Sequence, residues 1–70
     1  MNGIQIEHIL NVVEDRSAYN RAAIRREVGD YLRANMGTVV ADLSAHGKIT
    51  IKTTYGDIDL SKADLESVTA

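Results

Sequence analysis

The segment KITIKTTYGDIDL, residues 48–60, decides the fold of this chain. Its first half alternates isoleucine with basic and β-branched polar side chains, which predicts a strand with one buried face. Residues 55–57 supply a turn, and Ile58 and Leu60 then alternate with acidic residues as the returning strand. The segment therefore predicts a β-hairpin. The exposed face of its first strand is predicted to carry Lys48, Thr50 and Lys52.

The segments on either side of the hairpin differ in how clearly they are specified. Residues 61–64, SKAD, have the spacing of a capping box with Asp in place of Glu, and they predict a short helix over about residues 62–68. Residues 38–46 fit two structures. As a strand they would add a third member to an antiparallel sheet, whereas as a helix they would begin at Thr38 and end at Gly47.

The N-terminal half has the spacing of helices. Apolar residues predict a first helix over about residues 4–15, and polar residues at 15–20 interrupt the stripe, with Ser17 and Asn20 as candidate N-caps. A second helix is predicted from residue 18 or 21 towards residue 36, followed by a stop at Gly37. Its apolar stripe is predicted to consist of Ile24, Val28, Tyr31 and Leu32. Gly29 is either tolerated within this helix, or Gly29 and Asp30 form a turn in which Asp30 caps a new helix.

The length and composition limit the chain to one small α+β domain over residues 1–70, with two or three N-terminal helices, the hairpin and a short C-terminal helix. A domain of this size buries only about 60% of the surface of its unfolded chain. Cysteine is absent, so no disulfide stabilises the domain. We therefore expect a second subunit, most simply in a homodimer, to supply the missing stability.

Charge is distributed unevenly along the chain. Residues 16–33 contain five arginines against Glu27 and Asp30, a net charge of +3, whereas the remainder contains three lysines against eight acidic residues, a net charge of −5. The total of −2 argues against a polybasic strand binder and against an acidic polyanion mimic. The arginine-rich window is either a solvated helix face or a surface that binds phosphate or carboxylate groups.

Two segments of the chain resemble the winged helix-turn-helix DNA-binding domains. Residues 21–29, RAAIRREVG, look like the second helix of that family, and residues 39–49, VVADLSAHGKI, look like the end of a recognition helix that leads into a wing. The hairpin would then be the wing, with Gly56 at its tip. The resemblance covers about residues 5–60 and implies a small DNA-binding regulator that acts as a dimer. The chain departs from the pattern because the segment that corresponds to the recognition helix is poor in Lys and Arg.

A DNA-binding function assigns roles to the basic residues. Arginines would contact the backbone and the groove, and lysines of the hairpin would hold the flanking phosphates, so that affinity would fall steeply with salt. A helix over residues 38–46 favours this hypothesis. The predicted nucleic-acid-binding residues are Arg21, Arg25, Arg26, Arg33, Lys48 and Lys52.

The second hypothesis is a protein-binding adaptor or inhibitor of the kind that phages and mobile elements encode, acting on a partner protein without DNA. The overall acidity and the lack of a catalytic set motivate it, and a strand over residues 38–46 favours it. The partner would present an acidic surface to the basic residues, or it would pack on the first helix or on a free sheet edge. The predicted interface residues are Ile6, Ile9, Val13 and Tyr55.

The sequence contains no pattern that points to catalysis, a cofactor or a metal. The two histidines, His8 and His46, lie far apart, and residues 57–64 lack the glycine and the closing glutamate of a calcium loop. We therefore expect a protein that is not an enzyme. No run approaches the length of a membrane span, and no basic start precedes an apolar segment, so a cytoplasmic location is the expectation.

Overall fold

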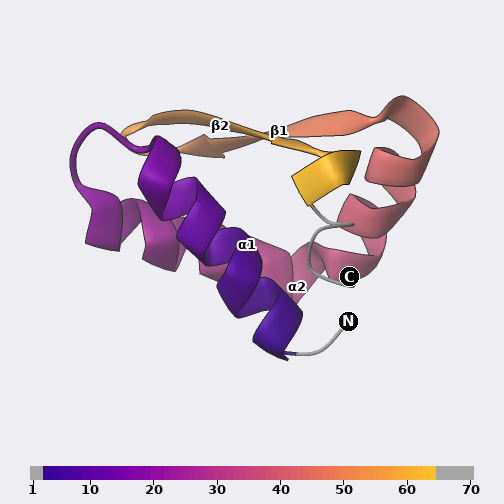
Figure 1. Ribbon diagram of the computed structural model, residues 1–70, viewed down its shortest axis with the longest axis horizontal. Coiled ribbons are helices and arrows are strands. Elements are labelled where there is room, and N and C mark those ends of the chain that lie inside the picture. Colours follow the sequence, from indigo (N-terminus) through magenta and orange to yellow (C-terminus); the bar gives the residue numbers. More distant parts are fainter. Residues whose placement is uncertain (1–2, 65–70) are drawn as a thin grey trace.

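The computed structural model describes residues 3–64 and has an α+β architecture. Its elements are helix α1 (Gly3–Arg16), helix α2 (Arg21–His46), strand β1 (Lys48–Thr53) and strand β2 (Gly56–Ser61). The hairpin of β1 and β2 lies along one side of the molecule, with the two helices beneath it (Figure 1). The second half of α2 turns towards the hairpin and leads directly into β1 (Figure 1).

The break between the helices falls where the polar residues predict it. Ser17 directly follows the first helix, and its hydroxyl donates a hydrogen bond to the Val13 carbonyl at 2.9 Å instead of capping α2. Asn20 takes the N-cap position of α2 in a left-handed conformation with φ of 57°, and its side chain makes no capping bond. Asn tolerates this region better than other non-glycine residues. The connection 17–20 is therefore a tight turn and not a continued helix.

The predicted stop at Gly37 is wrong in position, because Gly37 is helical, but α2 is interrupted two residues earlier. Asn35 has a non-helical φ of −130°, and α2 consists of two helical segments that meet at this kink, the second of which runs to His46. Residues 38–46 are therefore helical and form no third strand, and the sheet has two strands in the order β1-β2. The reason is the apolar stripe, which continues past Gly37 at helical spacing. Its members are Ile24, Val28, Leu32, Met36, Val39 and Leu43.

Gly29 lies inside α2 at a point of close helix contact. A Cβ atom placed there would lie 3.3 Å from Leu10 Cδ1 of α1 and 2.9 Å from Arg33 Nη1. The glycine therefore allows the two helices to approach each other, and no turn forms at Gly29 and Asp30.

The hairpin confirms the predicted alternation. The turn consists of residues 54 and 55 and not of the predicted residues 55–57, and the strands pair antiparallel from Thr53 and Gly56 to Lys48 and Ser61. Gly47 enters the hairpin in a left-handed conformation with φ of 81°, and its N–H donates to the Leu43 carbonyl at 2.9 Å, which closes α2. One face of the sheet packs on the helices. That face carries Ile49, Ile51, Ile58 and Leu60.

The hydrophobic core includes most of the first helix's apolar stripe. Ile9 and Val13 are 2% and 0% exposed, and Ile6 packs against the core at its edge. The prediction that Ile9 and Val13 face a partner is therefore corrected, because these residues belong to the chain's own core, which α1 builds mainly with α2. Ile6 is only partly buried, so its assignment to an interface stays a prediction.

The capping box at the end of β2 is confirmed. The Ser61 N–H donates to Asp64 Oδ2 at 2.7 Å, and the Asp64 N–H reaches Ser61 Oγ at 3.4 Å. Residues 62–64 are helical and begin the predicted C-terminal helix. The rest of that prediction, residues 65–68, lies outside the described residues.

Candidate functional site

Two of the predicted DNA-contacting arginines are engaged with α1. Arg25 forms ion pairs with Glu7 and Glu14, the latter at 2.9 Å, and it also donates to Asn11 Oδ1 at 2.8 Å. Arg33 lies 4.0 Å from Glu7 and is more exposed. These arginines join the two helices, so the positive charge of Arg25 in particular is balanced within the molecule.

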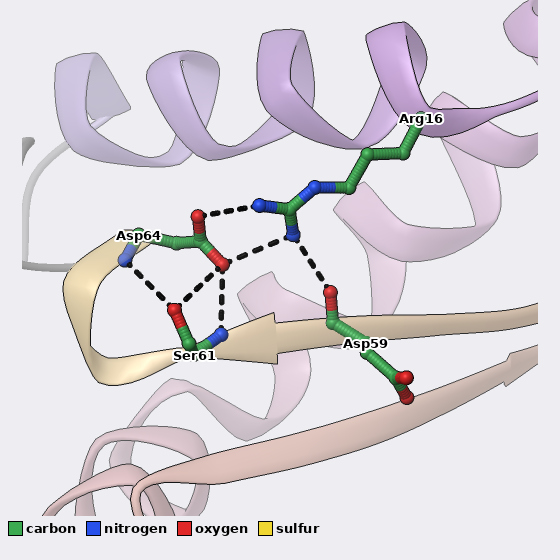
Figure 2. A network of polar contacts seen from close by, with 4 residues as sticks. All are labelled: Arg16, Asp59, Ser61 and Asp64. Atoms are coloured by element: carbon green, nitrogen blue, oxygen red, sulfur yellow. Dashed lines mark hydrogen bonds and ion pairs between the residues drawn. The ribbon is translucent and has the colours of Figure 1, made fainter.

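Arg16 is engaged at the opposite end of α1 (Figure 2). Its guanidinium group makes a bidentate contact with Asp64 at 2.8 and 3.0 Å and donates to the Asp59 carbonyl at 2.8 Å. Burial alone would raise the pKa of the Asp64 carboxyl, but the hydrogen bonds from Arg16 and Ser61 outweigh it and lower that pKa. The hydrogen bond with Asp64 likewise raises the pKa of Arg16. The contact therefore holds the segment after β2 against the end of α1.

The other predicted cationic residues do not form one patch. Arg21 directs its Nε to the Ser17 carbonyl at 3.1 Å, and Arg26 is exposed with no hydrogen bond or ion pair within residues 3–64. Helical spacing places Arg26 on the side of α2 opposite Ile24 and Val28, away from the core. Lys48 and Lys52 lie on the outer face of the hairpin, across the core from that side. The predicted set is thus divided between opposite surfaces.

A pocket of about 140 Å³ lies where the helix connection meets the hairpin turn. It is lined by residues 16–19, by Ile24 of α2 and by residues 55–58. Tyr19 and Tyr55 are both among the lining residues, and they are 68% and 42% exposed. The pocket is therefore lined by two exposed aromatic side chains together with the buried side chains of Ile24 and Ile58.

Both walls of this pocket are held by defined contacts. The connection 17–20 is fixed by the turn at Asn20, whose carbonyl accepts a hydrogen bond from the Ile24 N–H at 2.9 Å. The hairpin turn is fixed from α2, because Glu27 Oε1 accepts hydrogen bonds from the N–H and the hydroxyl of Thr54 at 3.0 and 3.1 Å. The Tyr55 N–H in turn donates to Thr53 Oγ1 at 3.1 Å.

One of the two pocket tyrosines was singled out from the sequence. Tyr55 was predicted to be an interface residue, and it lines the pocket, whereas Tyr19 was not predicted and is the more exposed of the two. Tyr31, which was assigned to the apolar stripe of α2, is 40% exposed and lies at its edge. The exposure of Tyr19 could have been predicted from its place among the polar residues 15–20, which interrupt the apolar stripe of the helices.

Within residues 3–64, no group of three or more His, Cys, Asp or Glu side chains is arranged to hold a metal ion. No helix in this part of the chain is long and apolar enough to span a membrane. No protein-family model, curated protein or solved structure matches the sequence or the fold.

Proposed function

We propose that this chain is a small, non-enzymatic protein-binding module, an adaptor or inhibitor that engages a partner through the pocket between residues 16–19 and the hairpin turn. One observation carries the proposal. All three aromatic residues of the chain are tyrosines, and two of them, Tyr19 and Tyr55, are exposed at this single pocket.

Exposed tyrosines of this kind suit protein recognition. A tyrosine ring offers a large apolar area together with a hydroxyl group, and it loses little conformational freedom when it is buried by a partner. Tyrosine and arginine are enriched among the residues that dominate binding energy. Ile24 and Ile58 also line the pocket and add apolar atoms beside the two tyrosines.

The electrostatics of the molecule agree with a protein target. The net charge is −2, and the strongest arginine contacts, those of Arg16 and Arg25, are made to carboxylates of the same chain. Counterion release from nucleic acid requires cations that are free to approach phosphates. Few such cations lie together on one face.

The experiment compares tyrosines that differ in position. The tagged full chain and the variants Tyr19→Ala, Tyr55→Ala and Tyr31→Ala are expressed in the cells that encode the protein, and bound proteins are quantified. The affinity of the enriched protein for each variant is then measured by calorimetry. Loss of a hot-spot tyrosine is expected to weaken binding by about 30-fold, corresponding to about 2 kcal/mol.

Tyr31→Ala is the matched control, because Tyr31 is as exposed as Tyr55 but does not line the pocket. It is expected to leave the affinity unchanged. The proposal fails if the pocket variants keep the same partners with the same affinity as the wild-type chain.

A second candidate function is a DNA-binding regulator that resembles the winged helix-turn-helix family and acts as a dimer. The observation that favours it is the helix over residues 38–46, which leads through Gly47 directly into the hairpin. Titration of the full chain with a generic duplex at low and high salt tests this candidate. Salt-sensitive binding that Arg26→Ala and Lys52→Ala reduce would support it, whereas affinity unchanged in these variants would remove it.

A further inference from the structure

The register of the hairpin determines which backbone groups point outward. Because the turn has two residues, Thr53 and Gly56 form a pair that exchanges backbone N–H···O=C hydrogen bonds. Along an antiparallel ladder such hydrogen-bonded pairs alternate with pairs that exchange no backbone hydrogen bonds, here called bonded and unbonded pairs. The next bonded pairs are Ile51 with Ile58 and Ile49 with Leu60. The backbone N–H and C=O groups of the intervening β1 residues therefore point to the outer edge. These residues are Lys48, Thr50 and Lys52.

Two further contacts agree with this alternation. The Lys62 N–H donates to the Gly47 carbonyl at 2.9 Å. Gly47 and Lys62 therefore form the next bonded pair after the unbonded pair of Lys48 and Ser61. The Asp59 carbonyl and the Ser61 N–H belong to unbonded pairs, and both bond to side chains outside the ladder.

The two edges of the sheet differ in how they are covered. The Arg16 guanidinium group donates to the Asp59 carbonyl, and the Ser61 N–H donates to the Asp64 carboxylate (Figure 2). Two outward backbone groups of β2 are therefore hydrogen-bonded within the chain. No backbone group outside the hairpin bonds to Lys48, Thr50 or Lys52 within residues 3–64, and all three residues are exposed. Within the described residues the edge of β1 is thus less covered than that of β2, and such an edge is a template for strand addition.

We propose that the β1 edge binds an extended acidic segment of another protein as an added strand. Lys48 and Lys52 lie on the same face on either side of Thr50, and neither forms an ion pair within the described residues. An added strand with acidic side chains opposite both lysines would complement this charge. The five central residues of the segment would therefore be acidic, apolar, any residue, apolar and acidic. The two apolar side chains would lie on the same face of the sheet as Ile49, which the chain's own core leaves half-buried.

The charges argue against a second copy of this chain at the same edge. Antiparallel pairing of two β1 strands about Thr50 would place Lys48 of each copy directly opposite Lys52 of the other. Like charges at directly opposed positions destabilise a ladder. Lysines on an edge strand discourage such self-pairing.

The test uses a peptide with a central Glu-Val-Thr-Val-Glu sequence and the isotope-labelled full chain. We expect saturable binding that slows hydrogen exchange of the Thr50 and Lys52 amides, while the Ile49 and Ile51 amides are already slow in the free chain. A Lys-Val-Thr-Val-Lys peptide is the matched control. The double variant Lys48→Glu/Lys52→Glu should bind the acidic peptide about tenfold more weakly and should prefer the basic one.

The variant Thr50→Pro removes an outward N–H without removing a ladder bond, so it should abolish binding while the Ile51 amide stays protected. Alanine at Tyr19 and Tyr55 should leave peptide binding unchanged, which separates this surface from the pocket. The proposal is overturned if neither peptide binds, if both bind equally, or if binding leaves the exchange of the Thr50 amide unchanged. Concentration-dependent protection of the edge in the absence of peptide would assign it to a second copy instead.

Discussion

The substitution Asp64→Asn tests the contact that ties the end of β2 to α1. The Asp64 side chain is 13% exposed, accepts two hydrogen bonds from Arg16, and caps the following turn through Ser61. Asparagine keeps the shape of the side chain and one acceptor oxygen. It removes the negative charge and therefore converts charge-assisted bonds into neutral ones.

The expected magnitude follows from these contacts. Charge-assisted hydrogen bonds contribute about 1.5–3 kcal/mol and neutral ones about 0.5–1.5 kcal/mol. The Arg16 side chain is 45% exposed, so solvent screening reduces its share. We expect Asp64→Asn to lower the free energy of unfolding by about 1 kcal/mol, which corresponds to a fall in Tm of about 4–8 °C for a domain of this size. Asp64→Ala, which also removes the cap, should cost about 2 kcal/mol.

The pH dependence separates the charge from the shape of the side chain. Because the pKa of Asp64 is lowered in the folded state, its stabilisation is complete above the ordinary value of 3.8 and is lost as the pH falls through the folded-state pKa. Thermal unfolding of the wild type and of Asp64→Asn is followed by circular dichroism. The two proteins should differ in Tm at pH 7 and should have the same Tm at a pH below the folded-state pKa of Asp64. Asp42→Asn is the matched control, because Asp42 is exposed on α2 and has no partner within residues 3–64. An equal difference at both pH values, or an equal effect of the control, would refute the reasoning.

Three further outcomes follow from the structure. Gly37→Ala should raise the free energy of unfolding by about 0.5–1 kcal/mol, since Gly37 is helical and nothing crowds its Cβ position, whereas Gly47→Ala should lower it by about 1 kcal/mol because φ there is 81°. In thermal melts Gly37→Ala should raise Tm and Gly47→Ala should lower it. A higher Tm for both variants would contradict the left-handed conformation of Gly47. Leu32→Ala, at a fully buried position, should cost about 2–5 kcal/mol in urea denaturation, and a smaller loss would place Leu32 outside the core. Arg25→Ala should cost about 1 kcal/mol at low salt and less at high salt, and a salt-independent loss would argue against the ion pairs with α1.

The local features of the fold could be predicted from the sequence. The alternation of residues 48–60 set both the hairpin and the face on which its lysines lie, and the spacing of Ser61 and Asp64 indicated the capping box. Period-two patterning and capping are local effects, so a single sequence carries them. The helix was predicted to end at Gly37, whereas it is interrupted at Asn35 and then resumes, because the apolar stripe continues through Met36 to Val39.

The candidate site could be predicted only in part, because it depends on how the helices pack. Arg25 meets Glu7 and Glu14 only when α1 and α2 lie against each other, and no local pattern states which face of each helix will meet. The same is true of Tyr19 and Tyr55, which are distant in the sequence and come together when the helix connection meets the hairpin turn. The aromatic content indicated candidate contacts, but tertiary packing decided which of them share a pocket.

The hydrogen bonds from Thr54 to Glu27 have a consequence for the thermodynamics of binding. A free hairpin turn would lose backbone freedom when a partner packed on it, at about 1–2 kcal/mol per residue fixed. Here the carboxylate of α2 already restrains the turn from below, and Thr53 restrains the Tyr55 backbone from within the hairpin. The hairpin turn therefore loses its backbone freedom during folding and not on binding. A partner that packs on Tyr55 meets a preorganised surface.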